Sequence, residues 1–410
     1  MPDKLRIAVR KFEPFEKAMK QAWDAYCESS GCDLAVELIA MDLHDLYEAT
    51  ITKEGLKKGD WDIAHMNTDW VYEAFTQGGL SNLRPYLEEN PPVDYPHGWS
   101  KALLHLQEFD EAVVGLPFHD GPECLVYRKD LFEASENRQR FLTQYGRPLS
   151  VPQTWNEFVE VARFFHQPAK NLFGVVMGIY PDGHNAVFDF CLQLWSRGGK
   201  LVKTNGDLNI DSQEAVEALA FYKALVHNKA LMHPNSSAYE SVQAGAAFAR
   251  GEAAMMINWF GFAAVCEVQE DSLMKGRVDV APIPKGAAGS LASLNVYWLY
   301  TLGAGSRHKA RAYDFIRFAV SPIQDKKLTM AGGIGCRLST WKDEEINRLI
   351  PYYHKLEALH QLSNTLPQNK NWASIAARID ELIQQVLHTS EDIQTLLKEA
   401  QAAIRRLEKQ

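Results

Sequence analysis

The 410-residue chain is longer than one hydrophobic core usually supports, so its length predicts two domains. Hydrophobic residues make up 46% and charged residues 23%, which is typical of a packed globular protein rather than a disordered or membrane-spanning one. The 52 acidic against 43 basic residues give a formal net charge of −9, and no run of basic residues interrupts the chain, which argues against nucleic-acid binding.

The chain opens with a predicted strand, a loop and a helix. Leu5, Ile7 and Val9 alternate with polar or small residues as in a strand, and apolar residues then recur at helical spacing from Phe15 to Tyr26. Further elements are predicted at residues 36–40 (strand), 45–58 (helix), 62–66 (strand) and 69–77 (helix, ending at a Gly-Gly pair). This alternation predicts a doubly wound, mainly parallel sheet.

A second set of elements follows Pro117. Thr154 to Glu157 has the sequence of a capping box and predicts the start of a helix, and Asp211 to Glu214 open another helix in the same manner. Strands are predicted at residues 174–179, 278–284 and 296–302, and helices at 309–319 and from residue 372 onward, with Ser390 as a cap. The second half of the chain therefore predicts a second α/β unit.

The N-terminus carries no apolar secretion segment, and no apolar stretch approaches the roughly 20 residues that cross a bilayer. Because residues 5–9 already predict the first strand, we expect a mature secreted protein whose leader was removed and replaced by Met1. A cytosolic protein is the alternative.

The six cysteines are dispersed, with no CxxC pair and no metal-type clustering with histidine. They are expected to be buried small hydrophobic residues. Cys27 and Cys32, which flank a predicted helix end, are the pair close enough in sequence to suggest a disulfide. We predict neither a metal site nor a cofactor.

Signatures of common enzymes are absent: the chain contains no GxGxxG, GxxxxGK[ST], GxSxG or HExxH. This favours a protein without catalytic activity. A glycoside hydrolase is the alternative, since its paired carboxylates need no fixed local spacing.

Unusual residues follow the first three predicted strands, where ligands bind in open α/β sheets. They are Lys11, Phe12 and Glu13 after the first strand, Asp42 after the second, and Asn67, Thr68 and Asp69 after the third. Glu13 and Asp69 also precede helices, where an acid often serves as a cap or complements the helix dipole.

Candidate ligand contacts also occur later in the chain, namely His119, Asp120, Tyr180, Asp182, Trp259, Phe260, Tyr297, Trp298 and Arg337. Each has a structural alternative. Asp182 lies in a Pro-Asp-Gly sequence typical of a turn, and aromatic residues such as Trp259 usually belong to a core. Arg337 follows a glycine-rich segment, where its guanidinium suits paired ligand oxygens or an ion pair that pins two loops.

Collinear segments of the chain resemble the extracellular solute-binding proteins of family 1, the sugar-binding subunits of ATP-driven importers. They are Trp61–Ala64, Gly79–Leu87, Val114–Pro117, Leu125–Phe132, Val151–Phe158, Arg197–Gly199, Phe248–Met255 and Pro282–Gly286. Each segment alone is weak, but their common order across nearly the whole chain is specific. The chain departs from the family at 332–339, where the usual proline before the arginine is absent, and in its missing leader.

The resemblance implies a two-lobed α/β fold of the periplasmic-binding-protein type, with the solute in the cleft. It places one lobe at residues 1–117 plus 279–320 and the other at 118–278 plus 321–410. It also implies that the candidate residues named above line the pocket, that a sugar-like or polyol solute is bound, and that the permease subunits of an ABC importer are the partners. A monomeric protein, in the periplasm or anchored at the cell surface, is expected.

Polyhydroxyl solutes offer alternating hydrogen-bond donors and acceptors and apolar C–H faces, which carboxylates, amides and aromatic rings match. The predicted mechanism is capture of the solute by closure of the lobes, which the solute favours only as far as it binds the closed form better. Besides the hydrolase, a cytosolic regulatory or scaffold module is the remaining alternative.

Overall fold

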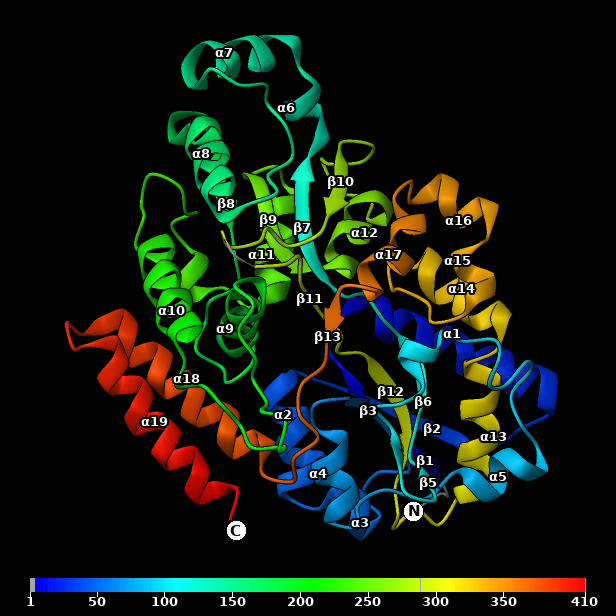
Figure 1. Cartoon of the computed structure of the whole chain (residues 1–410). Helices are drawn as coiled ribbons and strands as arrows, with labels where there is room; N and C mark the ends of the chain where they lie inside the picture. The colour runs from blue at the N-terminus through cyan, green and yellow to red at the C-terminus, as the bar shows by residue number, and fades with distance from the viewer. Residues whose placement is uncertain (1–3, 288, 410) are drawn as a thin grey trace. The chain divides into compact units, whose positions relative to one another are not determined.

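The computed structural model describes residues 4–287 and 289–409 (Figure 1). The chain divides into two compact units. The first unit comprises Met1–Gly121, Val296–His354 and Gln368–Lys370, and the second comprises Pro122–Asn295, Lys355–Pro367 and Asn371–Gln410. Within the described part of the chain, no helix combines the length and the apolar character needed to cross a membrane.

The first unit contains a five-stranded mixed sheet in the order β2-β1-β3-β12-β6. Its strands are β1 (Lys4–Arg10), β2 (Ala35–Met41), β3 (Ile63–Asn67), β6 (Leu116–His119) and β12 (Trp298–Leu302). Strand β1 pairs in parallel with β2 and β3, whereas β12 runs antiparallel to both of its neighbours, β3 and β6. The carboxyl ends of β1, β2, β3 and β6 therefore meet at the edge where β12 begins.

Helices and short strands complete the first unit. They are α1 (Glu13–Ser30), α2 (Leu43–Tyr47), α3 (Gly55–Lys58), α4 (Val71–Thr76), α5 (Arg84–Glu89), β4 (Glu108–Phe109), β5 (Ala112–Val113), α13 (Lys309–Ala319), α14 (Pro322–Met330), α15 (Leu338–Trp341) and α16 (Glu344–Leu349). Helix α1 buries Phe15, Met19, Trp23 and Tyr26, which recur at the helical spacing that the sequence predicted. Gly31 follows the helix in the left-handed conformation and caps its end.

The second unit contains a four-stranded mixed sheet in the order β10-β7-β9-β8. Its strands are β7 (Glu123–Arg128), β8 (Phe173–Val176), β9 (Ala253–Trp259) and β10 (Val278–Ala281), of which β7 runs antiparallel to β9 and β10. A small parallel pair, β11 (Ser293–Leu294) with β13 (Ser363–Asn364), lies beside this sheet. The predicted α/β class is confirmed, and in each sheet one strand is reversed.

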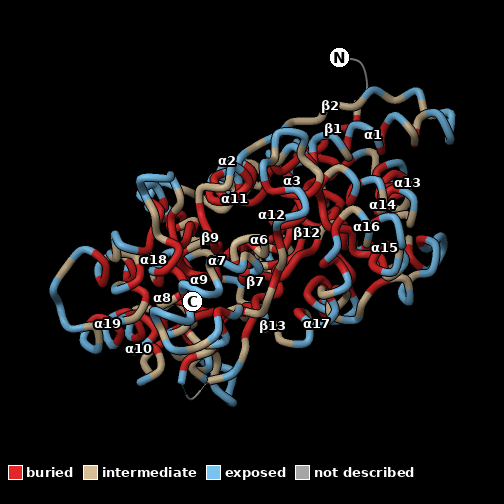
Figure 2. The backbone as a smooth tube through the Cα atoms, turned by 90° about the horizontal axis from the view of Figure 1, so that it is seen from above, coloured by how far each residue is buried: buried red, intermediate tan, exposed pale blue. Residues whose placement is uncertain are grey.

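The helices of the second unit are α6 (Lys129–Glu133), α7 (Ser135–Tyr145), α8 (Trp155–Phe165), α9 (Asn185–Ser196), α10 (Gln213–Val226), α11 (Ser241–Ala249), α12 (Phe260–Val268), α17 (Leu356–His360), α18 (Trp372–His388) and α19 (Ile393–Leu407). The capping box predicted for α8 is present: Thr154 Oγ1 accepts from the Glu157 amide, and the Glu157 carboxylate accepts from the Thr154 amide. The residues drawn as buried in Figure 2 include most of β12 in the first sheet and of β7 and β9 in the second.

Three local predictions were wrong. The helix expected at residues 45–58 is broken into α2, a π-helical turn (Glu48–Thr52) and α3, and Glu54 between them has a φ of 56°. Helix α10 is capped by Ser212 rather than by Asp211, and α19 is capped by Asp392 rather than by Ser390. In both of these helices a neighbouring residue with equal capping propensity reaches the first-turn amide.

The two compact units differ from the predicted lobes chiefly at residues 279–295 and 321–354. Residues 279–281 belong to β10, and β11 pairs with β13, which keeps this segment in the second unit. Helix α14 packs on α1, and the Asp325 carboxylate on α14 accepts from the backbone amides of Cys336 and Arg337, which ties the segment after β12 to the first unit.

Candidate functional site

A row of polar and aromatic residues occupies the strand edge of the first unit. Trp298, the first residue of β12, is the register partner of Asn67 at the end of β3 and of His119 at the end of β6. The loops that leave β1 and β2 at the same edge begin with the exposed residues Lys11 and Asp42. The structure thus brings residues predicted from distant parts of the sequence to one edge.

Phe15 links the aromatic residues of this edge. Its ring lies 5.1 Å from that of Phe12, 4.6 Å from that of His119 and 6.0 Å from that of Trp298, all in edge-to-face geometry. Trp298 also meets Trp70 at 6.1 Å. Because Phe12, His119 and Trp298 are only partly buried, the cluster presents ring surface at the edge while Phe15 anchors it in the core.

His119 is held as a neutral donor. Its Nδ1 accepts from the Ile334 amide at 2.9 Å, so the proton of the neutral ring is on Nε2. Burial lowers the pKa of His119 well below its ordinary value, against a smaller opposing effect of Asp120. Asp120 itself is 1% exposed, and its amide donates to the Ile334 carbonyl. The ring therefore carries no charge at neutral pH.

Thr68 and Tyr297 are tied to each other inside the first unit. The Thr68 amide donates to the Tyr297 carbonyl at 3.0 Å, and Thr68 Oγ1 accepts from the Tyr297 amide at 3.1 Å. The Tyr297 hydroxyl donates to Gln107 Oε1 at 2.7 Å and accepts from the Leu106 amide. Tyr297 is 0% exposed, so these contacts use it to fix β12 against the loop before β4.

Several predicted acidic residues act at helix starts. Asp42 caps α2 by accepting from the Asp45 amide at 2.9 Å. Asp182 accepts from the amides of His184 and Asn185 at 2.8 and 2.9 Å, at the start of α9. Glu13 is the exposed first residue of α1, where its charge complements the helix dipole. Asp69 does not cap α4; the residue before that helix is Trp70, and the Asp69 amide donates to Asn67 Oδ1.

Arg337 is buried rather than presented at the strand edge. Its guanidinium lies 3.8 Å above the Trp99 ring, donates from Nη2 to the Val93 carbonyl at 2.6 Å and pairs with Asp94 at 3.8 Å. The residue is 1% exposed. These contacts match the alternative in which Arg337 pins two loops, here residues 93–99 and 331–337.

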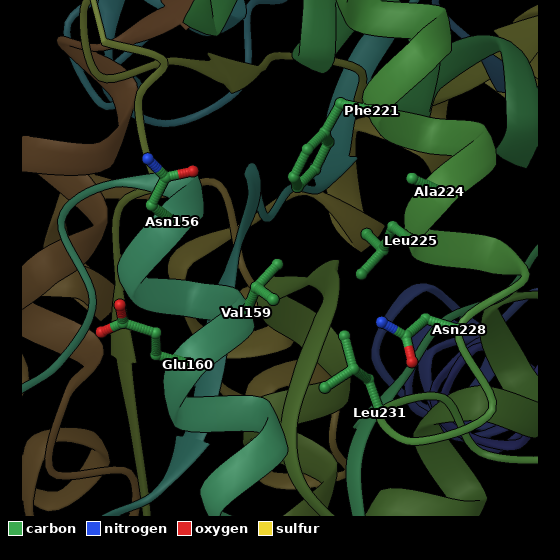
Figure 3. A pocket seen from close by; sticks show the side chains of 8 residues that line it. All are labelled: Asn156, Val159, Glu160, Phe221, Ala224, Leu225, Asn228 and Leu231. Atoms are coloured by element: carbon green, nitrogen blue, oxygen red, sulfur yellow. The ribbon is translucent and has the colours of Figure 1, made fainter. Parts of the chain in front are cut away.

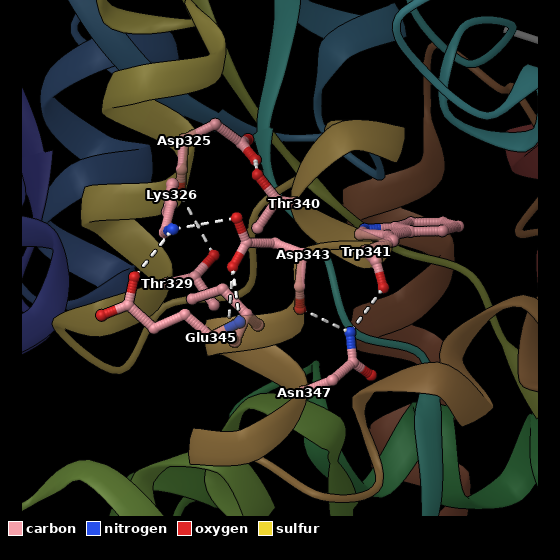
Figure 4. Close-up of polar contacts among 9 residues, drawn as sticks. Asp325, Lys326, Thr329, Thr340, Trp341, Asp343, Glu345 and Asn347 are labelled. Carbon is pink, nitrogen blue, oxygen red and sulfur yellow. Dashed lines mark hydrogen bonds and ion pairs between the residues drawn. The ribbon is translucent and has the colours of Figure 1, made fainter.

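A polar network connects α14, α15 and α16, the helices that precede and follow Arg337 in the chain (Figure 4). Asp325 accepts from the Thr340 hydroxyl at 2.6 Å, and Lys326 bridges Asp343 and Glu345 at 2.9 and 2.8 Å. Burial raises the pKa of Asp325 to about 6, although its hydrogen bonds act in the opposite direction. The network supports the segment that carries Arg337.

The strand edge of the second unit is built around Trp259. This tryptophan ends β9, is partly exposed and meets the ring of Phe188 on α9 at 5.8 Å in edge-to-face geometry. Phe260, which was predicted beside it as a ligand contact, is 0% exposed in the first turn of α12. Tyr180 is 43% exposed after β8.

Sequence reasoning missed two acidic residues at this edge. Glu123, the first residue of β7, is the register partner of Trp259, and Asp189 on α9 accepts from the Tyr222 hydroxyl at 2.8 Å. Burial raises the pKa of both carboxyl groups, and the charge of Asp189 adds to the effect on Glu123. An acid directly before the apolar run Cys124–Tyr127 was the available signal. Asp189 lies in a wholly buried stretch of helix and gave no local signal.

A separate pocket of about 420 Å³ lies between α8 and α10 in the second unit (Figure 3). Its walls are formed by Asn156, Val159, Glu160, Phe221, Ala224, Leu225, Asn228 and Leu231. None of the predicted ligand contacts lines it. Among the residues that the structure describes, no group of three or more His, Cys, Asp or Glu side chains is arranged to hold a metal ion.

Two α/β units with polar and aromatic residues at their strand edges are the architecture expected of a solute-binding protein. The sequence model described as "Bacterial extracellular solute-binding protein" matches residues 17–326, and the chain belongs to this family. A probable ABC transporter-binding protein of Deinococcus radiodurans is 24% identical over 347 residues, which cover 83% of this chain and 78% of that protein.

Solved structures of similar proteins share the fold across nearly the whole chain. MalE3 of T. maritima, solved with bound maltose, has a TM-score of 0.85 at 24% identity and covers 98% of this chain and 99% of its own. An ABC transporter solute-binding protein from Agrobacterium radiobacter K84, in complex with ribitol, has a TM-score of 0.84 at 23% identity, with 99% and 100% covered. The predicted family and two-lobed α/β fold are confirmed.

Proposed function

We propose that this protein captures a sugar or polyol solute and delivers it to the permease subunits of an ABC importer. The observation that carries the proposal is the row of Asn67, Trp298 and His119 on three neighbouring strands of the first unit. It combines an amide, a partly exposed aromatic ring and a neutral imidazole donor, which are the groups that polyhydroxyl solutes require. Family membership and the maltose and ribitol found in similar structures support the same solute class.

The proposed contacts are the predicted residues that retain accessible surface at the strand edges. In the first unit they are Lys11, Phe12, Glu13, Asp42, Asp69, His119 and Trp298, with Asn67 beside them; in the second unit they are Tyr180 and Trp259. Thr68, Asp120, Asp182, Phe260, Tyr297 and Arg337 are proposed to hold these residues in place, because they are buried.

We propose that the site binds its solute without chemical change. A flat ring such as Trp298 or Trp259 accepts the apolar C–H face of a sugar, and the carboxylates and amides exchange hydrogen bonds with its hydroxyl groups. The neutral His119 donates from Nε2, and a donor held in place before the solute arrives reduces the ordering cost of binding. No step in this mechanism requires a nucleophile or a general acid.

The family's description supports an extracellular location, and we propose that the protein works as a monomer in the periplasm or anchored at the cell surface. Release of the solute to a permease needs only two states of the protein with different affinities.

A thermal-shift screen tests the proposal, using neutral sugars, polyols, amino sugars and acidic sugars. A solute present at a hundredfold excess over its Kd stabilises the protein by about 2.7 kcal/mol. Trp298→Ala is expected to reduce the shift, whereas Phe221→Ala, in the separate pocket of the second unit, is the control that leaves it unchanged. Failure of every compound to raise the melting temperature would overturn the proposal, and turnover of a chromogenic glycoside would favour the hydrolase.

A further inference from the structure

Two buried carboxyl groups lie beside Trp259 in the second unit. Glu123 pairs in register with Trp259, and Asp189 directly follows Phe188, whose ring contacts the Trp259 ring. The exposed fractions of Glu123 and Asp189 are 5% and 6%. The two acids come from β7 and α9 and are 66 positions apart in the sequence, so the fold alone brings them together.

Among the residues that the structure describes, no basic side chain forms an ion pair with either acid. Within the described part of the chain, the charge that acts on Glu123 is that of Asp189, which has the same sign. Glu123 Oε2 is buried and has no hydrogen-bond partner among the described residues. Asp189 Oδ2 accepts from the hydroxyl of Tyr222, a neutral donor, so the pair has acceptor capacity that the protein leaves unused.

Further negative charge surrounds the pair. Asp182, which accepts from the Asn185 amide at the start of α9, and Asp380 on α18 lie close enough for their charges to interact, and the charge of Asp182 also acts on Asp189. The amides at the start of α9 are already bound by Asp182. The charges that act on the pair are thus those of other acidic side chains, and burial keeps Glu123 and Asp189 protonated as long as they have no cationic partner.

An ionised carboxylate that is buried without a partner is unfavourable, so the pair ionises only when a cation is bound beside it, and a cationic group is the ligand that such a site stabilises most. An ammonium group supplies up to three N–H donors and a positive charge, and its hydrogen bonds to carboxylates are stronger than those of a hydroxyl. The neighbouring Trp259 ring is also the best aromatic partner for a cation. A metal ion fits this site less well than an ammonium group, because the described residues contain no group of three or more His, Cys, Asp or Glu side chains that could hold one.

We propose that Glu123 and Asp189 form a subsite that accepts an ammonium group of the solute, so that the preferred solute is an amine-bearing sugar or polyol. This inference rests on the proposed function and narrows its solute class. Trp259 would lie against the C–H face of the same solute next to the charged group.

Matched pairs of compounds test the subsite: D-glucosamine with D-glucose, D-galactosamine with D-galactose, and D-glucamine with D-sorbitol, each at pH 7 by thermal shift and calorimetry. We expect the amine of at least one pair to bind ten times more tightly than its neutral partner. Glu123→Gln is expected to abolish this preference, and Asp189→Asn, which keeps an acceptor for Tyr222, serves as a second variant if the first does not fold.

Glu267→Gln is the matched control, because Glu267 is also a buried glutamate of the second unit whose Oε1 has no hydrogen-bond partner among the described residues, but it lies on α12 next to Gly276. It should keep the amine preference. Equal or tighter binding of the neutral members, or a preference that survives both Glu123→Gln and Asp189→Asn, would overturn the subsite while leaving the proposed function intact. Binding of none of the six compounds would count against both.

Discussion

Truncation of Trp259 separates a ligand-binding role from a core role. The residue is partly exposed at the end of β9, and the ring contact that the structure records for it is with Phe188 at 5.8 Å. Such an edge-to-face pair contributes about 0.5–1.5 kcal/mol, whereas truncation of a fully buried tryptophan costs about 3–5 kcal/mol. Trp259→Ala is therefore expected to lower the free energy of unfolding by about 0.5–1.5 kcal/mol.

The loss of binding free energy on this substitution should be at least as large as the loss of stability. If the ring is a platform for the solute, its removal weakens affinity at least tenfold, or about 1.4 kcal/mol. Urea unfolding of the ligand-free protein measures the first quantity, and calorimetry with the most stabilising compound of the thermal-shift screen measures the second. Trp372→Ala is the control, because Trp372 on α18 is 1% exposed and its loss should cost stability without affecting affinity.

The reasoning would be refuted if Trp259→Ala lost about as much stability as Trp372→Ala while its affinity stayed unchanged. That result would assign Trp259 to the core of the second unit.

Four further outcomes are expected. Arg337→Lys keeps the charge but cannot both stack on Trp99 and reach the loop carbonyl, so the free energy of unfolding should fall by about 1–3 kcal/mol; an unchanged stability in urea unfolding would contradict the pinning role. Burial raises the pKa of Asp325 to about 6, above the value of the unfolded chain, so its contribution to stability is greatest below about pH 4 and falls as the pH rises to 6. The difference in unfolding free energy between wild type and Asp325→Asn should change by about 3 kcal/mol over this window, and a constant difference would refute the assignment. Cys27 and Cys32 are both free thiols, half-buried at the end of α1, and under oxidising conditions mass spectrometry should find any disulfide between these two; two free thiols would exclude it. Saturating solute should reduce the radius of gyration in solution scattering, as the family resemblance implies, and an unchanged value would count against closure of the lobes.

Local sequence signals determined most of the secondary structure. Helix α13 spans the residues predicted for it, Lys309–Ala319, because its apolar residues recur at helical spacing, and the capping box of α8 formed because its partners are three residues apart. Where several polar residues adjoin a helix start, as at 390–392, propensity did not distinguish them and the observed cap is Asp392. The helix predicted at 45–58 is interrupted by the π-helical turn Glu48–Thr52 and by Glu54, whose positive φ cannot continue a right-handed helix.

The family and the α/β class were also accessible from the sequence, since the order of short segments such as Val151–Phe158 is a property of the chain itself. The sequence also predicted that Lys11, Asp42 and Asn67 lie at strand ends on one edge of the sheet, because the carboxyl ends of parallel strands share one edge.

Only the tertiary structure decided which of the candidate residues are accessible. Tyr297 and Phe260 follow the same local pattern as Trp298 and Trp259, yet they are fully buried while their neighbours are partly exposed. The direction of a side chain depends on the strand or helix packed against it, and here Gln107, 190 positions away, binds the Tyr297 hydroxyl. Glu123 and Asp189 became a pair for the same reason: burial and proximity between distant segments arise from packing, which no local pattern in the sequence encodes.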